Sequence, residues 1–212
     1  MRIKTFVFNP FYENTYVVSS ESGNAIIVDP GCYEPFEVDD ICSYIQSENL
    51  TVKRVLNTHC HIDHVLGNEA MKEKFKCTLS IPVNEKEIFK AVTAYAPQWG
   101  ITGYRHSEVD EFLKDGEIIE LDEIKLKMIE VPGHSPGHLM FYEESQKLMI
   151  GGDVLFRESI GRTDLPGGNH DQLLKNIQER VYTLPDEVTV HPGHGPETTI
   201  GHEKKNNPFV RG

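Results

Sequence analysis

Apolar residues along the chain follow two patterns, short runs typical of strands and longer stretches with helical spacing. The short runs predict strands over residues 3–8, 15–19, 25–28, 52–56, 79–82, 117–121, 124–131, 139–143, 147–150 and 188–191. Apolar positions three or four residues apart predict helices over residues 37–48, from beyond residue 64 to 75, over 85–94, and from Asn169 or Asp171 to about 182. Strands dominate and helices are inserted between them, so the pattern predicts two sheets with helices outside.

Several segments lack both patterns. Residues 96–106 and the glycine-rich residues 156–169 are predicted to be surface loops, and residues 201–212 a polar, mostly irregular tail. Residues 108–122 hold seven acidic side chains against the single cation of Lys114, which predicts a solvated hairpin face.

The charge balance bears on possible partners. The chain of 212 residues has 21 Lys and Arg against 33 Asp and Glu, a formal net charge of −12. Phosphate backbones and anionic membrane surfaces are bound by clustered Lys and Arg, so we expect neither nucleic acid nor a membrane as partner. No stretch approaches the ~20 apolar residues of a membrane span. The apolar run near the N-terminus is predicted to be a first strand rather than a signal peptide.

The cysteines and the length add two expectations. Four cysteines without a CxxC pair form no disulfide framework, so we expect reduced thiols in a cytoplasmic protein. The length suits one domain with a buried core, as a monomer or small homo-oligomer.

The strongest chemical signal follows the predicted strand 52–56. His59, His61, Asp63 and His64 lie within six residues, where a tight turn can bring them to one point. Imidazole and carboxylate together suit Zn²⁺, Fe²⁺ or Mn²⁺. The alternative is a polar loop with several exposed histidines, which is far less common at this density of ligand-type residues.

Three further candidates, His134, Asp153 and His194, stand at the ends of later predicted strands. Each directly follows a glycine, or a pair of them, that lets the backbone turn sharply. Loops at strand ends on a rigid scaffold are usual positions for active sites. Alone, each residue would more often be a turn residue; together with the first cluster, the three are predicted to be metal ligands.

This order of residues resembles the metallo-β-lactamase superfamily, in which a strand-end HxHxDH is followed by a His, an Asp and a His. Within it the chain is most similar to short bacterial glyoxalase II-like proteins, also called hydroxyacylglutathione hydrolase-like. Residues 14–16, 29–31, 159–164 and 201–209 contribute to the likeness. The resemblance implies an α/β (α+β) fold, a four-layer αββα sandwich of two mixed sheets with helices on the outer faces. It also implies a single domain over residues 1–212, without the C-terminal helical domain that contacts glutathione in full-length glyoxalase II.

The resemblance implies a ligand set for two divalent metal ions, with zinc the default and iron or manganese as alternatives. The implied ligands form one set for each ion and a bridge: His59, His61 and His134; Asp63, His64 and His194; and Asp153. Asp63 would also act in catalysis by orienting a hydroxide that bridges the metals. Asp29 resembles a position where a carboxylate accepts an N–H from a ligating histidine, and a simple turn residue is the equal alternative.

The reaction implied is hydrolysis of a thioester, of the S-acylglutathione type or of a related acyl thiol. A metal-activated hydroxide attacks the carbonyl, and a thiolate leaving group needs little acid help. Arg157 and Arg162 could meet a substrate carboxylate. Pairing of Arg162 with Asp164 is a slightly favoured alternative for that residue.

Other functions remain open on the same scaffold. A persulfide dioxygenase with one Fe²⁺ shares the Gly-Arg-Thr-Asp segment at 161–164, but it usually has a Cys where Ile160 stands. Other small-ester or lactone hydrolases form a second alternative. Asp153 argues against a true lactamase, because many lactamases of the drug-resistance kind have a Cys there. A metal protein without catalysis and a nuclease are weaker candidates.

The remaining chemically active side chains are predicted to have supporting or no roles. His106, His170 and His202 are predicted to be exposed, whereas His138 and His191 are predicted to support the ligands or the fold. Cys60, between two ligands, is predicted to point away as a small apolar residue.

Overall fold

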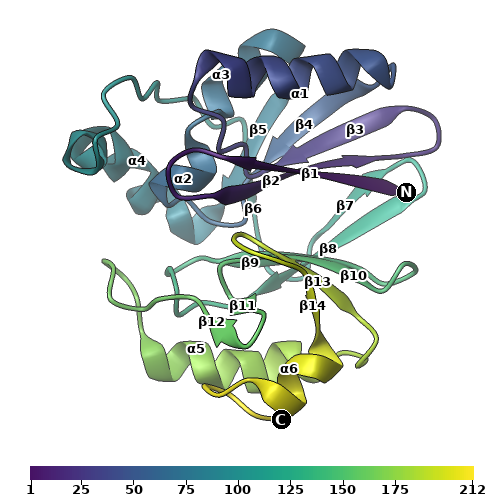
Figure 1. The fold of residues 1–212 in the computed structure, drawn as a ribbon, viewed down its shortest axis with the longest axis vertical. Helices are drawn as coiled ribbons and strands as arrows, with labels where there is room; N and C mark the ends of the chain where they lie inside the picture. Colours follow the sequence, from purple (N-terminus) through teal and green to yellow (C-terminus); the bar gives the residue numbers. More distant parts are fainter. The chain divides into compact units, whose positions relative to one another are not determined.

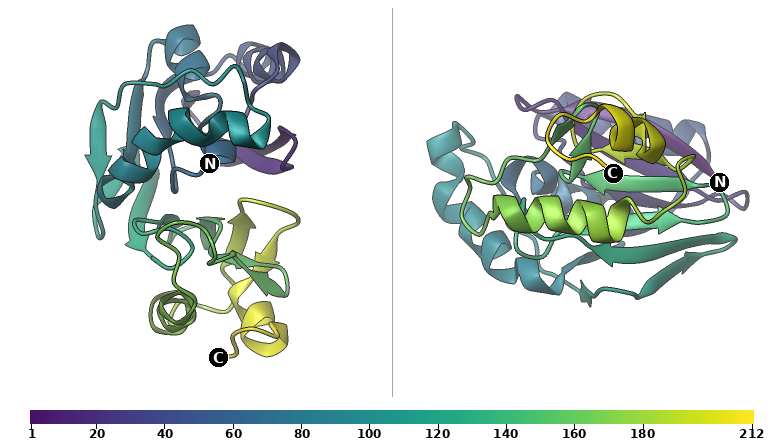
Figure 2. Two further views of the ribbon diagram at one scale, coloured as in Figure 1. Left: turned by 90° about the vertical axis from the view of Figure 1, so that its left-hand side faces the viewer. Right: turned by 90° about the horizontal axis from the view of Figure 1, so that it is seen from below.

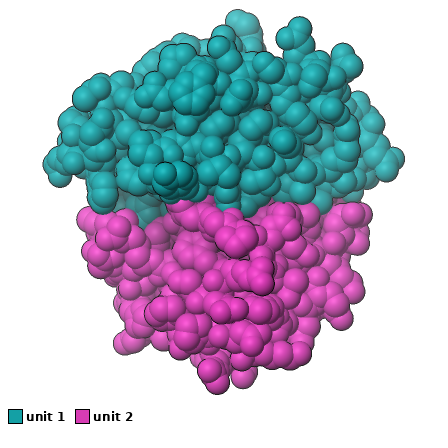
Figure 3. Space-filling model, viewed as in Figure 1, with its two compact units in different colours: residues 1–113, 120–124 teal, residues 114–119, 125–212 magenta.

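The computed structural model describes all residues from Met1 to Gly212 and divides into two compact units, coloured separately in Figure 3. Unit 1 comprises residues 1–113 and 120–124, and unit 2 comprises residues 114–119 and 125–212. The single domain expected over residues 1–212 stays a prediction.

Unit 1 is built on a six-stranded mixed sheet (Figure 1). Its strands, in spatial order, are β1 (Arg2–Phe8), β2 (Glu13–Ser19), β3 (Asn24–Val28), β4 (Thr51–Leu56), β5 (Thr78–Pro82) and β6 (Glu111–Leu113). The first three are antiparallel, and β3 to β6 run parallel. The carboxyl ends of the parallel strands therefore lie at one edge of the sheet, and the loops after β3 and β4 are neighbours.

The helices of unit 1 follow its parallel strands. They are α1 (Pro35–Ser47), α2 (Ile62–Val65), α3 (Asn68–Phe75) and α4 (Lys86–Tyr95), with 3₁₀ turns at Val83–Glu85 and Ala96–Trp99. In Figure 1, α1 and α3 cover one face of the sheet. Ile27, Val55 and Leu79, paired side by side on three adjacent strands, are completely buried in a core that also contains Ile41 of α1 and Met71 of α3.

A second six-stranded mixed sheet belongs mostly to unit 2. In spatial order its strands are β14 (Thr198–Thr199), β13 (Thr189–Pro192), β10 (Leu148–Gly152), β9 (Leu139–Glu143), β8 (Ile124–Glu130) and β7 (Ile118–Leu121). A small hairpin of β11 (Leu155–Phe156) and β12 (Ser159–Ile160) follows β10.

Two helical segments lie along one face of this second sheet (Figures 1 and 2). They are α5 (His170–Asn176), which continues through a π-helical turn at Ile177–Val181, and α6 (Ile200–Asn206). Asn169 caps α5, because its side chain accepts a hydrogen bond from the backbone N–H of Gln172 at 3.0 Å. Leu173 and Ile177 are completely buried, so this helix contributes to the core of unit 2.

The predicted combination of two mixed sheets and helices is confirmed, and each predicted strand is present. The prediction of a mostly irregular tail over residues 201–212 was wrong, because the helix α6 occupies Ile200–Asn206. The sequence offers little signal for this helix. Thr199 accepts a hydrogen bond from the His202 N–H at 3.1 Å, and Ile200 is the one large apolar side chain that the helix buries. The glycine-rich loop likewise contains the β11–β12 turn, and the unpatterned loop 96–106 begins with a 3₁₀ turn.

The acidic segment 108–122 is more than a solvated face. Asp110 pairs with Lys72 at 2.7 Å, and Asp115 pairs with Arg180 at 2.8 Å. Asp122 accepts hydrogen bonds from side chains of the β2–β3 turn, including Asn24 Nδ2 at 2.8 Å. Each of these carboxylates contacts a residue of the same compact unit.

None of the helices combines the length and the apolar character that crossing a membrane requires. The four cysteines are not joined in disulfides. The cytoplasmic location stays a prediction.

Candidate metal centre

In unit 1 the predicted metal motif follows the carboxyl end of β4, beside Asp29 at the end of β3. Asp29 Oδ1 accepts the Thr58 N–H at 2.7 Å, and Oδ2 accepts the Thr58 hydroxyl at 2.6 Å. The same Oδ2 lies 3.1 Å from His64 Nδ1. Asp29 therefore anchors the start of the motif loop and faces a histidine of the motif, while its own backbone turns at φ 48°.

The imidazoles of the motif are buried and close to one another. His59 and His64 are completely buried, and their ring centroids are 4.2 Å apart. His59 Nδ1 lies 3.1 Å from the Thr58 hydroxyl, and His64 Nε2 lies 3.7 Å from Asp63 Oδ2. Asp29, His59 and His64 offer ligand-type atoms within 4.8 Å of one another. Since the Asp29 oxygens already accept hydrogen bonds, we interpret this carboxylate as a support for His64 rather than as a ligand.

Unit 2 brings its three predicted ligands together at a single carboxylate oxygen. Asp153 Oδ2 lies 3.5 Å from His134 Nε2 and 3.6 Å from His194 Nε2. These distances are too long for good hydrogen bonds. Two ligands held about 2.1 Å from one ion at a tetrahedral angle lie about 3.4 Å apart, so the spacing fits metal ligands.

Backbone and side-chain contacts hold this constellation. His134 Nδ1 lies 2.7 Å from the Arg162 carbonyl oxygen, which can only accept, so Nδ1 carries the proton and Nε2 keeps its lone pair. The Asp153 N–H donates to His138 Nε2 at 3.0 Å, which gives the predicted supporting histidine a defined contact. Gly161 passes so close that an added Cβ would lie 1.8 Å from the Asp153 carbonyl oxygen.

The glycines before the strand-end residues behave differently from one another. Gly133 and Gly152 adopt positive φ values of 138° and 48°, as the turn argument predicts for the residues before His134 and Asp153. Gly193 does not adopt a positive φ, so the turn before His194 needs no left-handed residue.

Sequence reasoning missed two buried carboxyl groups beside the motif of unit 1. Glu13 is completely buried, and its Oε2 accepts the Thr15 hydroxyl at 2.8 Å, while Oε1 lies 3.9 Å from His64 Nδ1. Burial raises the pKa of the Glu13 carboxyl well above its ordinary value. An acidic residue inside a strand that is buried along its whole length was the available signal.

The second missed group is Glu85, which is also completely buried and precedes α4. Its Oε2 accepts the Cys60 N–H at 3.0 Å, so Glu85 holds the backbone of the motif loop at Cys60. The Cys60 side chain lies in the hydrophobic core, as predicted, and burial raises the pKa of its thiol. A thiol held in its neutral form is a poor metal ligand.

The two arginines after Asp153 differ. Arg162 makes a two-pronged ion pair with Asp164, with Nε and Nη2 each 2.7 Å from a carboxylate oxygen. This contact holds the pKa of Asp164 at about 2. Arg157 is exposed in the turn between β11 and β12 and has no ion pair.

The other histidines lie largely where the sequence predicted. His106 and His170 are exposed. His202 is half-buried instead, with Nε2 3.0 Å from Glu158 Oε1, because it belongs to the unpredicted α6. His191 is buried, and its Nδ1 lies 3.0 Å from Glu197 Oε1.

Comparison with known proteins decides the family. Residues 8–194 match the sequence profile of the metallo-β-lactamase superfamily. The chain belongs to the metallo-β-lactamase superfamily. A curated relative, hydroxyacylglutathione hydrolase GloC of Haemophilus influenzae, is 34% identical over 218 residues, covering 99% of this chain and 98% of the relative.

Solved structures confirm the fold. The BLEG-1 B3 metallo-β-lactamase matches with a TM-score of 0.91 and 31% identity over 100% of both chains. The protein TTHA1623, solved in a di-iron-bound form, matches with a TM-score of 0.86 and 32% identity over 98% of this chain and 100% of its own. The predicted metallo-β-lactamase fold is therefore confirmed, and the chain is a member of a superfamily of metal-dependent hydrolases.

Proposed function

We propose that this protein hydrolyses a thioester, S-acylglutathione or a related acyl thiol, with two divalent metal ions. The observation that carries the proposal is the similarity to GloC along almost the whole chain. The ligand-type spacing of Asp153, His134 and His194 supports the metal dependence.

We assign the metal ligands as two sets and one bridge: His59, His61 and His134; Asp63, His64 and His194; and Asp153. The chemistry of this donor set, imidazole nitrogens and carboxylate oxygens, fits zinc, iron and manganese alike. We propose zinc, with iron as the alternative because the similar TTHA1623 was solved with two irons.

When bound, two such ions supply Lewis acidity and lower the pKa of a bound water. Contacts within the chain orient the histidine rings that would hold the ions. Asp29 and the Arg162 carbonyl accept from Nδ1 of His64 and His134, so Nε2 of each ring would be the atom that holds a metal ion. We propose that Asp63 orients the attacking water.

The two arginines after Asp153 differ in whether a carboxylate of the chain already pairs with them, which bears on substrate binding. The Arg162 guanidinium is engaged by Asp164, whereas Arg157 has no ion pair. We therefore propose Arg157 as the residue that meets a substrate carboxylate. A small-molecule thioester as the substrate, a monomer or small homo-oligomer and a cytoplasmic location remain parts of this proposal.

The deciding experiment uses the purified protein with its metals measured. Free-thiol release from an S-acylglutathione is followed beside oxygen uptake with glutathione persulfide. We expect thiol release without oxygen uptake. Oxygen consumption by protein with one iron, and no thiol release, would establish a persulfide dioxygenase instead.

Variants test the ligand assignment in the same assay. We expect His59→Ala to lose the first metal and turnover, because no neighbouring group replaces the imidazole nitrogen. The exposed His170→Ala, a matched control, should keep both. Unchanged activity in His59→Ala would refute the assignment.

The similarity to BLEG-1 favours one second candidate, hydrolysis of a β-lactam amide. A β-lactam is therefore included as a third substrate. We expect the thioester to react faster, since a thiolate leaves more readily than an amide nitrogen. Faster β-lactam turnover would reverse the order of the two candidates.

A further inference from the structure

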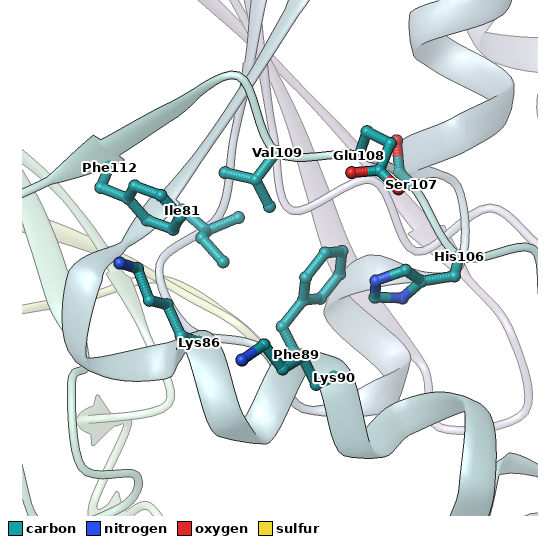
Figure 4. A pocket seen from close by; sticks show the side chains of 9 residues that line it. All are labelled: Ile81, Lys86, Phe89, Lys90, His106, Ser107, Glu108, Val109 and Phe112. Carbon is teal, nitrogen blue, oxygen red and sulfur yellow. The ribbon is translucent and has the colours of Figure 1, made fainter.

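Unit 1 contains a pocket that the proposed reaction does not use, between α4 and the segment before β6 (Figure 4). Its volume is about 310 Å³, at the lower end of the range for small-molecule sites. Four apolar side chains and five polar ones line it: Ile81, Phe89, Val109 and Phe112; Lys86, Lys90, His106, Ser107 and Glu108. The pocket thus joins an apolar wall to a polar rim.

The rim carries excess positive charge on a strongly acidic chain. Lys86 and Lys90 are one helical turn apart, so both side chains leave α4 toward the pocket, as Figure 4 shows. They face a single lining carboxylate, Glu108. Lys86 makes no ion pair, and its ammonium lies 3.8 Å from the centre of the Phe112 ring. Lys90 pairs only with the exposed Glu87, at 2.8 Å.

A hydroxyl at the pocket has no hydrogen-bond partner. Ser107 is 1% exposed, and its Oγ is buried without a partner. Leaving a polar group buried and unsatisfied is unfavourable, so such a group calls for an explanation. A bound ligand that accepts from this hydroxyl would supply one.

The wall beside it suits a flat apolar group. The rings of Phe89 and His106 lie against each other with centroids 4.5 Å apart and planes inclined by 35°. Phe112 contributes a third ring, at the end of the pocket near Lys86. An aromatic ring of the ligand could pack on these side chains.

We propose that this pocket binds a small amphipathic anion, a carboxylate or phosphate carried on an aromatic or compact apolar body. The anionic group contacts Lys86, Lys90 and the Ser107 hydroxyl. The apolar body packs against the rings of Phe89 and Phe112. The pocket lies wholly within unit 1 and stands independently of the proposed thioester hydrolysis.

Phenyl phosphate is the probe that tests the site, with phenol as its neutral counterpart. Binding to the full-length protein is followed by amide chemical shifts and by calorimetry. We expect saturable shifts in residues 81–112 and about tenfold weaker binding of phenol, because it lacks the charge-assisted contacts. Shifts confined to residues outside this range, or equal binding of phenol, would overturn the proposal.

Two charge-matched variants separate the site from general electrostatics. Lys86→Gln removes a lining ammonium, whereas Lys74→Gln removes an exposed one in α3 that does not line the pocket. Both change the net charge equally. We expect weaker phenyl phosphate binding only in Lys86→Gln, and an equal effect of the two variants would contradict the site.

Ser107→Ala gives an independent readout. The free protein should be at least as stable as before, because an unsatisfied hydroxyl is removed, while phenyl phosphate binding weakens several-fold. Thermal unfolding measured with and without phenyl phosphate distinguishes the two effects. If Ser107→Ala binds phenyl phosphate as tightly as the natural protein, the Ser107 hydroxyl does not contact the ligand and the proposed site is contradicted.

Discussion

At the scale of single residues, the contacts of Nδ1 determine how the histidines of the centre can act. The His64 ring faces the Asp29 carboxylate, and the His134 ring donates to the Arg162 carbonyl. Both contacts fix the tautomer and leave the Nε2 lone pair of each ring available to a metal ion. Metal affinity should therefore depend on groups that never touch the ion.

Asp29→Asn tests this dependence. Asparagine keeps the shape and tolerates the left-handed backbone at this position, but it removes the charge that faces His64. We expect affinity for the second metal to fall roughly 10–100-fold, with little change in fold. Competition with a chromogenic chelator measures the metal affinity. The control is Asp40→Asn, because Asp40 is exposed on α1. Equal affinities in the two variants would contradict the supporting role.

The Arg162–Asp164 pair makes a prediction about pH. The hydrogen bond from Arg162 lowers the pKa of Asp164 from 3.8 to about 2, so the ionised pair favours the folded state above pH 3.8. That contribution is lost as the pH falls toward 2. Arg162→Gln should raise the Asp164 pKa toward its ordinary value, as measured by a carboxyl NMR titration. It should leave the KM for the thioester unchanged, whereas a large rise in KM would make Arg162 a substrate contact.

At the scale of elements, the proposed ligands stand at strand ends, and contacts from other segments hold their loops. In the loop after β4, Asp29 accepts the Thr58 N–H and Glu85 accepts the Cys60 N–H. In unit 2, the loop after β10 is held by His138 and by the close passage of Gly161. The ligands therefore sit on loops with little freedom to move.

Gly161→Ala tests how closely that second loop is fitted. A Cβ would lie 1.8 Å from the Asp153 carbonyl oxygen and 3.1 Å from His134 Nδ1, so both residues would have to move. We expect loss of bound metal and of turnover, measured by metal analysis and by thiol release. Gly103→Ala, where the nearest atom is 3.4 Å away, should behave like the natural protein. Full metal content in Gly161→Ala would show that the loop tolerates the shift.

At the scale of the whole molecule, the sequence predicted the longer strands and the ligand-type residues, because both leave local signals, whereas the two- and three-residue strands β6, β11, β12 and β14 were not predicted. A buried strand is a run of apolar residues, and the HxHxDH cluster lies within six positions. Glu13 and Glu85 were missed because their roles depend on distant neighbours, His64 and Cys60, that share no spacing with them. The helix α6 was missed because its burial depends on one large apolar residue, Ile200.

The most direct test is a metal titration of the chelator-stripped protein. Zn²⁺ is added in steps while free-thiol release from an S-acylglutathione is recorded at each metal-to-protein ratio. If the proposed ligand set holds two ions, with Asp153 serving both, turnover should rise until about two equivalents are bound and then stay constant. Full activity at one equivalent, or no thiol release at any loading with zinc, iron or manganese, would contradict a two-metal thioester hydrolase.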